Sequence, residues 1–182
     1  MHRPKAPLGR RPSPTFGTTA NASIGSAAYS FLGAAVAIDI MNIPGTPLSS
    51  TESEKYMESV AMARGIGWAN VLAEVDLPQP KPLPIWGDNR IAIELSKNAR
   101  SGKATAHFAR RISYTQDMYD AGEYHPEHIP TERNPVDFFG KMVSAGKYRS
   151  SVSYHMNLAY EVPITDADMA RAKAAFHATK KA

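Results

Sequence analysis

Residues 77–98, with the sequence LPQPKPLPIWGDNRIAIELSKN, decide the fold of this chain. The prolines that open the stretch favour a stiff, extended linker, because proline restricts the φ angle and has no backbone N–H to donate. The apolar run that follows predicts a short buried strand ending at Asp88. From residue 89 to residue 97 the apolar side chains are spaced as in a helix. The stretch therefore predicts a linker, a strand and a helix in succession, with an aspartate at the end of the strand.

The segment before this stretch predicts a hairpin followed by a long helix. Residues 29–43 are apolar and rich in small or β-branched side chains, and Gly33 interrupts them, which is typical of a β-hairpin. Any of the three hydroxyl residues at 49–51 can cap a helix. Apolar residues then recur in steps of three and four up to about residue 75, which predicts a helix of about six turns.

The segment after this stretch predicts alternating helices and strands. A helical pattern runs from about residue 105 to residue 119, and EYHPEHIPT at 123–131 is typical of a strand that enters a turn. Asn134 and Pro135 favour the start of another helix, with the asparagine as its cap.

The C-terminal part predicts an extended segment and one more helix. Tyrosines recur at six-residue steps within residues 148–160, which fits no single helix face and indicates an extended segment. Thr165 and Asp168 form a capping box for a helix at about 166–180. We therefore treat residues 148–182 as a C-terminal extension of the domain.

Length and composition limit the class of protein. The 182 residues, 43% of them hydrophobic, are enough for one domain with tails. No apolar run approaches the roughly 20 residues of a membrane-spanning helix. The chain contains no cysteine, which excludes disulfides and thiolate chemistry. Carboxylates, histidines and hydroxyls are left for any catalysis.

The net charge of +4 comes from the N-terminal segment. Residues 1–38 contain no acid and four basic residues, namely Arg3, Lys5, Arg10 and Arg11, while the remaining basic and acidic residues balance. With its prolines, residues 1–22 form an extended basic arm by this interpretation. The arm is a solvated tail, an organelle-targeting segment or a contact with nucleic-acid phosphates, and the sequence leaves these alternatives open.

Four motifs in fixed order resemble one known family. They are LSSTESE at 48–54, the stretch at 78–98, TAHFARR at 105–111 and HIPTERNPVDFFGKM at 128–142. Together they resemble the ribonuclease H domain of copia-type retrotransposon polyproteins, over about residues 26–145. The resemblance implies an α/β, ribonuclease H-like fold with a mixed five-stranded sheet and helices on both faces. It places the domain at residues 23–147, and it implies cleavage of the RNA strand of RNA–DNA hybrids by two divalent metals.

The resemblance also implies four metal-binding carboxylates, which this chain retains only in part. Asp88 and Asp137 match the third and fourth positions, whereas Thr19 stands at the position of the first, bridging aspartate. A hydroxyl cannot neutralise two closely spaced dications. The second position is Glu54 when the motif is aligned forward from SSTE, or Lys55 when it is aligned backward from Tyr56 and Trp68. The resemblance therefore implies a degenerate site in which Glu54, Asp88 and Asp137 are remnants.

Each remnant carboxylate also has an ordinary structural explanation. Acidic residues favour the first turn of a helix, as at Glu54 and Asp137, and Asp88 can cap the helix that follows it. Arg110 and Arg111 are candidate nucleic-acid contacts, or else a solvated helix face.

We expect a non-catalytic ribonuclease H-like protein of retroelement origin that acts as a structural or RNA-contacting subunit of a large assembly. Its expected partners are protein subunits and RNA. A mitochondrial ribosome or another organelle complex is the most specific expectation, with the nucleus or cytoplasm as alternatives. We expect no cofactor. One alternative is an active ribonuclease H that uses Mg²⁺, with Asp39 replacing the missing ligand. Another is a decayed retroelement fragment.

Overall fold

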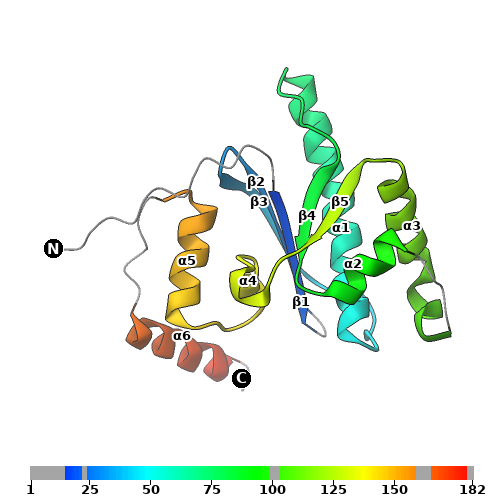
Figure 1. Ribbon diagram of the computed structural model, residues 1–182. Coiled ribbons are helices and arrows are strands. Elements are labelled where there is room, and N and C mark those ends of the chain that lie inside the picture. Colours follow the sequence, from blue (N-terminus) through cyan, green and yellow to red (C-terminus); the bar gives the residue numbers. More distant parts are fainter. Residues whose placement is uncertain (1–14, 22–23, 99–102, 159–164, 180–182) are drawn as a thin grey trace.

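A single sheet runs through the centre of the protein. The computed structural model describes residues 15–21, 24–98, 103–158 and 165–179. The strands are β1 (Thr15–Asn21), β2 (Ile24–Phe31), β3 (Ala34–Asn42), β4 (Leu83–Gly87) and β5 (Tyr124–His128). They form a five-stranded sheet in the order β3-β2-β1-β4-β5 (Figure 1). Neighbouring strands among β1, β2 and β3 are antiparallel, whereas β4 lies parallel to both β1 and β5.

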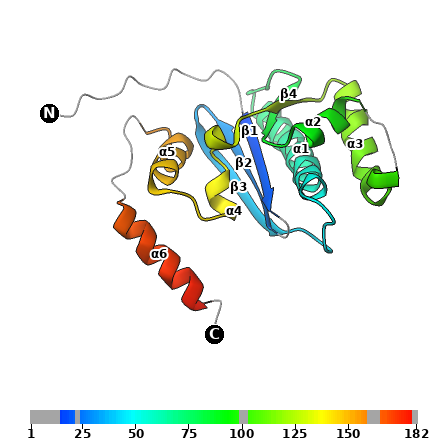
Figure 2. The ribbon, with the colours of Figure 1, turned by 60° about the horizontal axis from the view of Figure 1, so that its bottom comes forward.

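Helices cover both faces of this sheet. They are α1 (Ser50–Glu74), α2 (Arg90–Lys97), α3 (Ala109–Asp120), α4 (Asp137–Gly140), α5 (Ala145–His155) and α6 (Asp166–Thr179), with short 3-10 turns η1 (Lys103–Phe108) and η2 (Thr131–Arg133). Helices α1, α2 and α3 lie on one side of the sheet, and α4 and α5 lie on the other (Figures 1 and 2). No helix in the described part of the chain is both long and apolar enough to span a membrane.

The sequence signals explain most of these elements. The side chain of Ser49 accepts a hydrogen bond from the backbone N–H of Glu52 and caps α1, and Asn89 caps α2 in the same way. The hairpin between β2 and β3 turns at Leu32 and Gly33, both with positive φ, a conformation that glycine adopts without strain. The Thr165–Asp168 capping box of α6 is confirmed, since each backbone N–H donates to the side chain of the other residue.

The N-terminal boundary predicted for the domain is wrong. Residues 15–21 were assigned to the basic arm, but they form β1, which pairs with β2 on one side and with β4 on the other. The side chains of this segment show no clear strand pattern. The strand is held instead by backbone hydrogen bonds along both of its edges. Arg3, Lys5, Arg10 and Arg11 lie outside the described residues.

The hairpin begins earlier than predicted, at Ile24 rather than near residue 29. Small residues follow Ile24 at positions 25–28 of β2, and their size permits a close approach of α1. A Cβ atom on Gly25 would lie 2.1 Å from Cγ of Met57. Because such an overlap is impossible, glycine at this position lets the helix pack directly on the strand.

Two predictions for the C-terminal part also need correction. Asn134 does not cap α4; its side chain accepts a hydrogen bond from the backbone N–H of Val136, and α4 begins only at Asp137. The segment predicted to be extended from residue 148 is largely α5, capped by Ser144. Its tyrosines at six-residue steps share no helix face and so gave no helical signal, although Tyr148 packs on Phe138 of α4.

His155 anchors α5 to α4. Its ring packs against Phe138 and Phe139, and its Nε2 donates to the carbonyl oxygen of Pro135 at 3.0 Å. The side chain is buried, and burial lowers the pKa of the His155 imidazole below its ordinary value. The neutral form of this histidine is therefore the one that stabilises the fold.

The core between α1 and the sheet contains a buried charged network as well as apolar side chains. Lys55 is fully buried, and its Nζ donates to Glu58 at 3.1 Å, to the carbonyl oxygen of Ala92 at 3.3 Å and to Ser96. Glu58 also accepts from the hydroxyls of Ser96 and Tyr124, at 2.5 and 3.1 Å. Lys55 thus holds α1 against α2. The buried charges of Lys55 and Glu58 are each stabilised by the hydrogen bonds that their partners in this network supply.

We predict strong coupling between Lys55 and Glu58. Lys55→Met is expected to lower the free energy of unfolding by about 3–5 kcal/mol, because Glu58 would remain buried without its counter-ion. The double variant Lys55→Met/Glu58→Gln should cost clearly less than the sum of the two single changes. Urea denaturation of all four proteins measures the coupling, and additive costs would contradict it.

We predict that the fold becomes less stable in mild acid because of His155. A histidine whose folded pKa is lowered contributes stability that is present above the unfolded value of about 6.5 and is lost as the pH falls below it. The free energy of unfolding should drop by roughly 1 kcal/mol more between about pH 7.5 and pH 5.5 in the wild type than in His155→Gln. Equal pH dependence in the two proteins would refute the assignment.

Candidate active site

The strand pairing brings the first and third family positions together. Phe16 pairs with Ile85, and the next residue of β1 pairs with the next residue of β4. Continuing this parallel register by two residues brings Thr19 level with Asp88, which directly follows β4. Thr19, which the resemblance aligns with the bridging aspartate, therefore lies on the strand beside Asp88, and no residue of β1 is acidic.

The fourth position lies beside the third. Asp137 is the first residue of α4, which packs on β1 and β2, and its side chain is fully buried. Burial raises the pKa of the Asp88 carboxyl, and the negative charge of nearby Asp137 raises it further. Lys141 and a hydrogen bond from the Thr131 hydroxyl act in the opposite direction. The two aspartates thus interact electrostatically.

Both carboxylate oxygens of Asp137 contact lysine ammonium groups. Nζ of Lys141 lies 2.9 Å from Oδ1, one helical turn away in sequence. Nζ of Lys147, on α5, contacts Oδ2 and also donates to the carbonyl oxygen of Thr131. These lysines therefore neutralise Asp137 from two sides, and Lys147 ties α5 to η2 through Thr131.

Glu54, one of the two alternatives for the second family position, lies beside the residues that flank Asp88. Glu54 is buried and lines a small cavity together with Gly87 and Asn89, the residues on either side of Asp88. Lys55 does not line this cavity and instead contacts α2. The geometry thus favours the register aligned forward from SSTE, in which the helix keeps its carboxylate.

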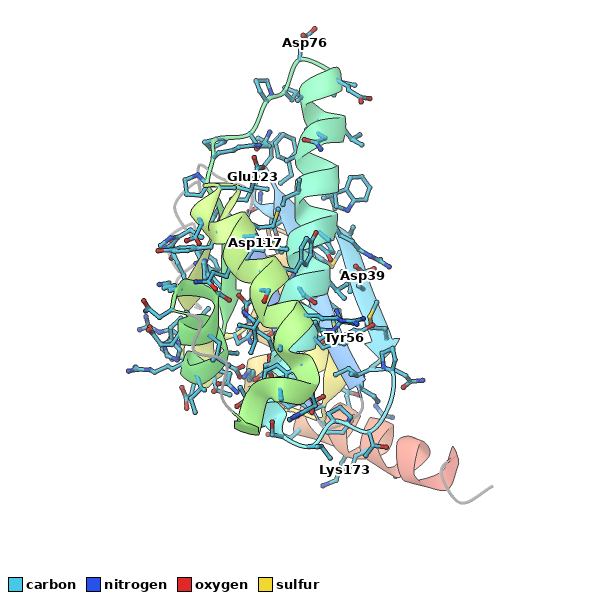
Figure 3. The ribbon with its side chains drawn as sticks, turned by 90° about the vertical axis from the view of Figure 1, so that its right-hand side faces the viewer. Asp39, Tyr56, Asp76, Asp117, Glu123 and Lys173 are labelled. Carbon is cyan, nitrogen blue, oxygen red and sulfur yellow. The ribbon has the colours of Figure 1, made fainter. Side chains whose placement is uncertain are left out.

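Asp39, the proposed substitute ligand, lies elsewhere. It sits on the outer strand β3, which β2 and β1 separate from β4. Its carboxylate accepts from the hydroxyl of Tyr29 at 2.8 Å and pairs with Arg64 of α1. Figure 3 shows it on the α1 side of the sheet. Three strand spacings amount to roughly 14 Å, so Asp39 cannot share a metal with Asp88.

The side chains present do not fit a two-metal centre. Two Mg²⁺ ions in one site need several converging carboxylates. Within the described ranges, no three His, Cys, Asp or Glu side chains lie close enough to hold a metal ion. The strand β1 carries no acidic residue, and Asp137 already contacts two ammonium groups. The charge balance of this cluster therefore differs from that of a metal site.

Sequence reasoning missed the basic half of this cluster. Lys141 follows Asp137 by four residues, so helical spacing could have indicated the pair. Lys147 gave no such signal, because it reaches Asp137 only through the folding of α5, a helix that the sequence did not predict. Arg110 and Arg111 lie on α3, on the other side of the sheet from α4 (Figure 1), and are not part of the cluster.

Known proteins resemble this chain in sequence and in fold. No protein-family model matches the chain. Over 133 residues the chain is 29% identical to the "Retrovirus-related Pol polyprotein from transposon TNT 1-94" of Nicotiana tabacum, a match that covers 71% of the chain and 10% of the polyprotein. The chain therefore spans about a tenth of the length of this relative.

Two solved structures of LC11-RNase H1 share the fold. The structure in complex with an RNA/DNA hybrid has a TM-score of 0.50 and covers 70% of this chain and 93% of its own. The structure of the enzyme isolated from compost by a metagenomic approach has a TM-score of 0.52, with coverages of 70% and 91%. Both are 12% identical to this chain, so they show the fold alone.

The chain has a ribonuclease H-like fold. It is similar in sequence to a retrotransposon polyprotein, which confirms the resemblance found in its motifs.

We predict opposite effects of neutralising the two aspartates. Asp137→Asn should lower the free energy of unfolding by about 1–3 kcal/mol, because it removes the charged partner of two lysines. Asp88→Asn should leave stability unchanged or raise it, because the folded state disfavours the charged form of this carboxyl. Thermal and urea denaturation near neutral pH compare the variants, and a larger loss for Asp88→Asn would contradict this picture.

Proposed function

We propose that this chain is a non-catalytic ribonuclease H-like protein of retroelement origin that serves as a structural or RNA-contacting subunit of a larger assembly. One observation carries the proposal. The strand beside Asp88 contains no acidic residue, and a threonine stands at the position that requires the bridging carboxylate. Without that ligand the charge of two adjacent dications is not balanced.

The charges around Asp137 support the same proposal. Lys141 and Lys147 already place two positive charges on its carboxylate. A divalent cation at this position would have to displace at least one of them and would meet the other at close range. The cluster is therefore stable without a metal ion, as a structural role requires.

The basic N-terminal segment and the C-terminal helix α6 support an assembly role. Four basic residues and no acid precede Asp39, a charge pattern suited to phosphate backbones. We propose RNA and protein subunits as partners, and an organelle complex such as a mitochondrial ribosome as the setting.

A second candidate function rests on a separate observation. Glu54 lines a cavity with the residues on either side of Asp88, and Asp88 interacts electrostatically with Asp137. A residual ribonuclease H activity dependent on Mg²⁺ is the function that these remaining carboxylates would support.

Hydrolysis of a labelled RNA–DNA hybrid tests the two candidates. We expect no cleavage by the purified chain with either Mg²⁺ or Mn²⁺, under conditions in which an active ribonuclease H cleaves the same hybrid. Asp88→Asn is the matched variant, because it removes a remnant carboxylate without a predicted loss of stability. Cleavage by the wild type that disappears in Asp88→Asn would overturn the non-catalytic proposal.

A further inference from the structure

A cleft separate from the remnant site lies between α1 and α3. It has a volume of about 560 Å³ and opens where the loop after β3 meets the first turns of both helices. Its lining includes Glu52 and Tyr56 of α1 together with His107, Arg110, Arg111 and Tyr114 of η1 and α3. Figure 3 faces these two helices and shows Tyr56 on α1. Asp137, by contrast, belongs to α4 on the opposite face of the sheet.

The guanidinium of Arg111 is fixed in this cleft. It lies 3.7 Å from the centre of the Tyr56 ring, and its Nη1 donates to the hydroxyl of Ser59 at 2.8 Å. Stacking on an aromatic face and a hydrogen bond together restrict the rotamers of a long side chain. A pre-ordered arginine binds an anion with less loss of conformational entropy than a mobile one.

The charge of the cleft is positive. Arg110 is exposed, and Arg111 adds a second positive charge. Glu52 is the one acid among the residues that line the cleft, and it accepts a hydrogen bond from the backbone N–H of Leu48 at 2.7 Å and contacts Nε2 of His107 at 3.0 Å. Its charge is therefore partly compensated, and two arginines dominate the potential.

Aromatic surface lies next to these cations. Tyr114 is 42% exposed and follows Arg110 by four residues, so the two side chains lie on the same face of α3. Arginines interleaved with exposed rings are the elements with which proteins bind single-stranded nucleic acids, through phosphate contacts and base stacking. An acidic peptide would match the charge but would leave the ring faces unused.

We propose that this cleft binds single-stranded RNA, with phosphates at Arg110 and Arg111 and a base stacked on Tyr114. The inference rests on the proposed RNA-contacting function and names the surface that makes the contact. It requires neither a metal ion nor the remnant carboxylates.

The test measures binding of a labelled single-stranded oligouridylate to the full chain by fluorescence anisotropy, at several salt concentrations. Arg110→Gln should reduce the slope of log K against log salt by about 0.7, the value for one lost phosphate contact on a single strand. Tyr114→Ala should weaken binding roughly tenfold and leave the slope unchanged. Both side chains are exposed, and circular dichroism checks that the variants fold.

Lys81→Gln is the matched control. It removes one positive charge from an exposed side chain near the other end of α1, where the lysine pairs with Glu123. We expect RNA binding with the affinity and slope of the wild type. A loss equal to that of Arg110→Gln would mean that binding follows net charge, and would overturn the cleft assignment.

Failure of this inference is distinguishable from failure of the proposed function. RNA binding that Arg110→Gln and Tyr114→Ala leave intact would overturn the cleft but not the RNA-contacting role. No binding by the wild type would overturn both and would leave a purely structural role. Displacement of the RNA by polyglutamate at equal charge concentration would refute RNA as the preferred ligand. The hybrid cleavage assay decides separately whether the chain is catalytic.

Discussion

The pairing of β1 with both β2 and β4 is the constraint on which the rest of the structure depends. It joins the N-terminal hairpin to the parallel strands β4 and β5, so that one sheet carries helices on both faces. The hydrogen bonds of this pairing come from the backbone and do not depend on which side chains the strand presents. A catalytic residue on β1 can therefore be replaced without loss of the sheet. The fold and the metal site are separable for this physical reason.

Electrostatics explains how the carboxylates of this cluster are balanced. A site that gathers several carboxylates is destabilised by their repulsion unless cations balance them. Here β1 contributes no acidic residue, and Asp137 pairs with Lys141 and Lys147. Burial, and then the charge of Asp137, raise the pKa of Asp88. The chain's own lysines therefore balance Asp137 and contribute to the docking of α4 and α5.

The elements with strong local signals could be predicted from the sequence, and those formed by tertiary contacts could not. The linker, β4 and α2 followed from prolines, one apolar run and helical spacing in residues 77–98, and α1 followed from its cap and apolar period. By contrast, β1 has no strand pattern and exists because both of its edges are paired. Helix α5 was missed because its contacts come from Lys147, Tyr148 and His155, which form no apolar stripe that a sequence pattern would reveal.

The same distinction applies to the candidate site. Asp88 and Asp137 could be identified from motifs, because each stands at the end or start of a predictable element. The choice between Glu54 and Lys55 could not be made from motifs, because one inserted residue shifts the register by 100° around a helix of about 3.6 residues per turn.

Only packing decides it, and α1 then presents two faces with different chemistry. Glu54 and Glu58 face β4, whereas Glu52 and Tyr56 face α3. Since members of each pair are four residues apart, a change of function on the β4 face leaves the surface toward α3 unaltered.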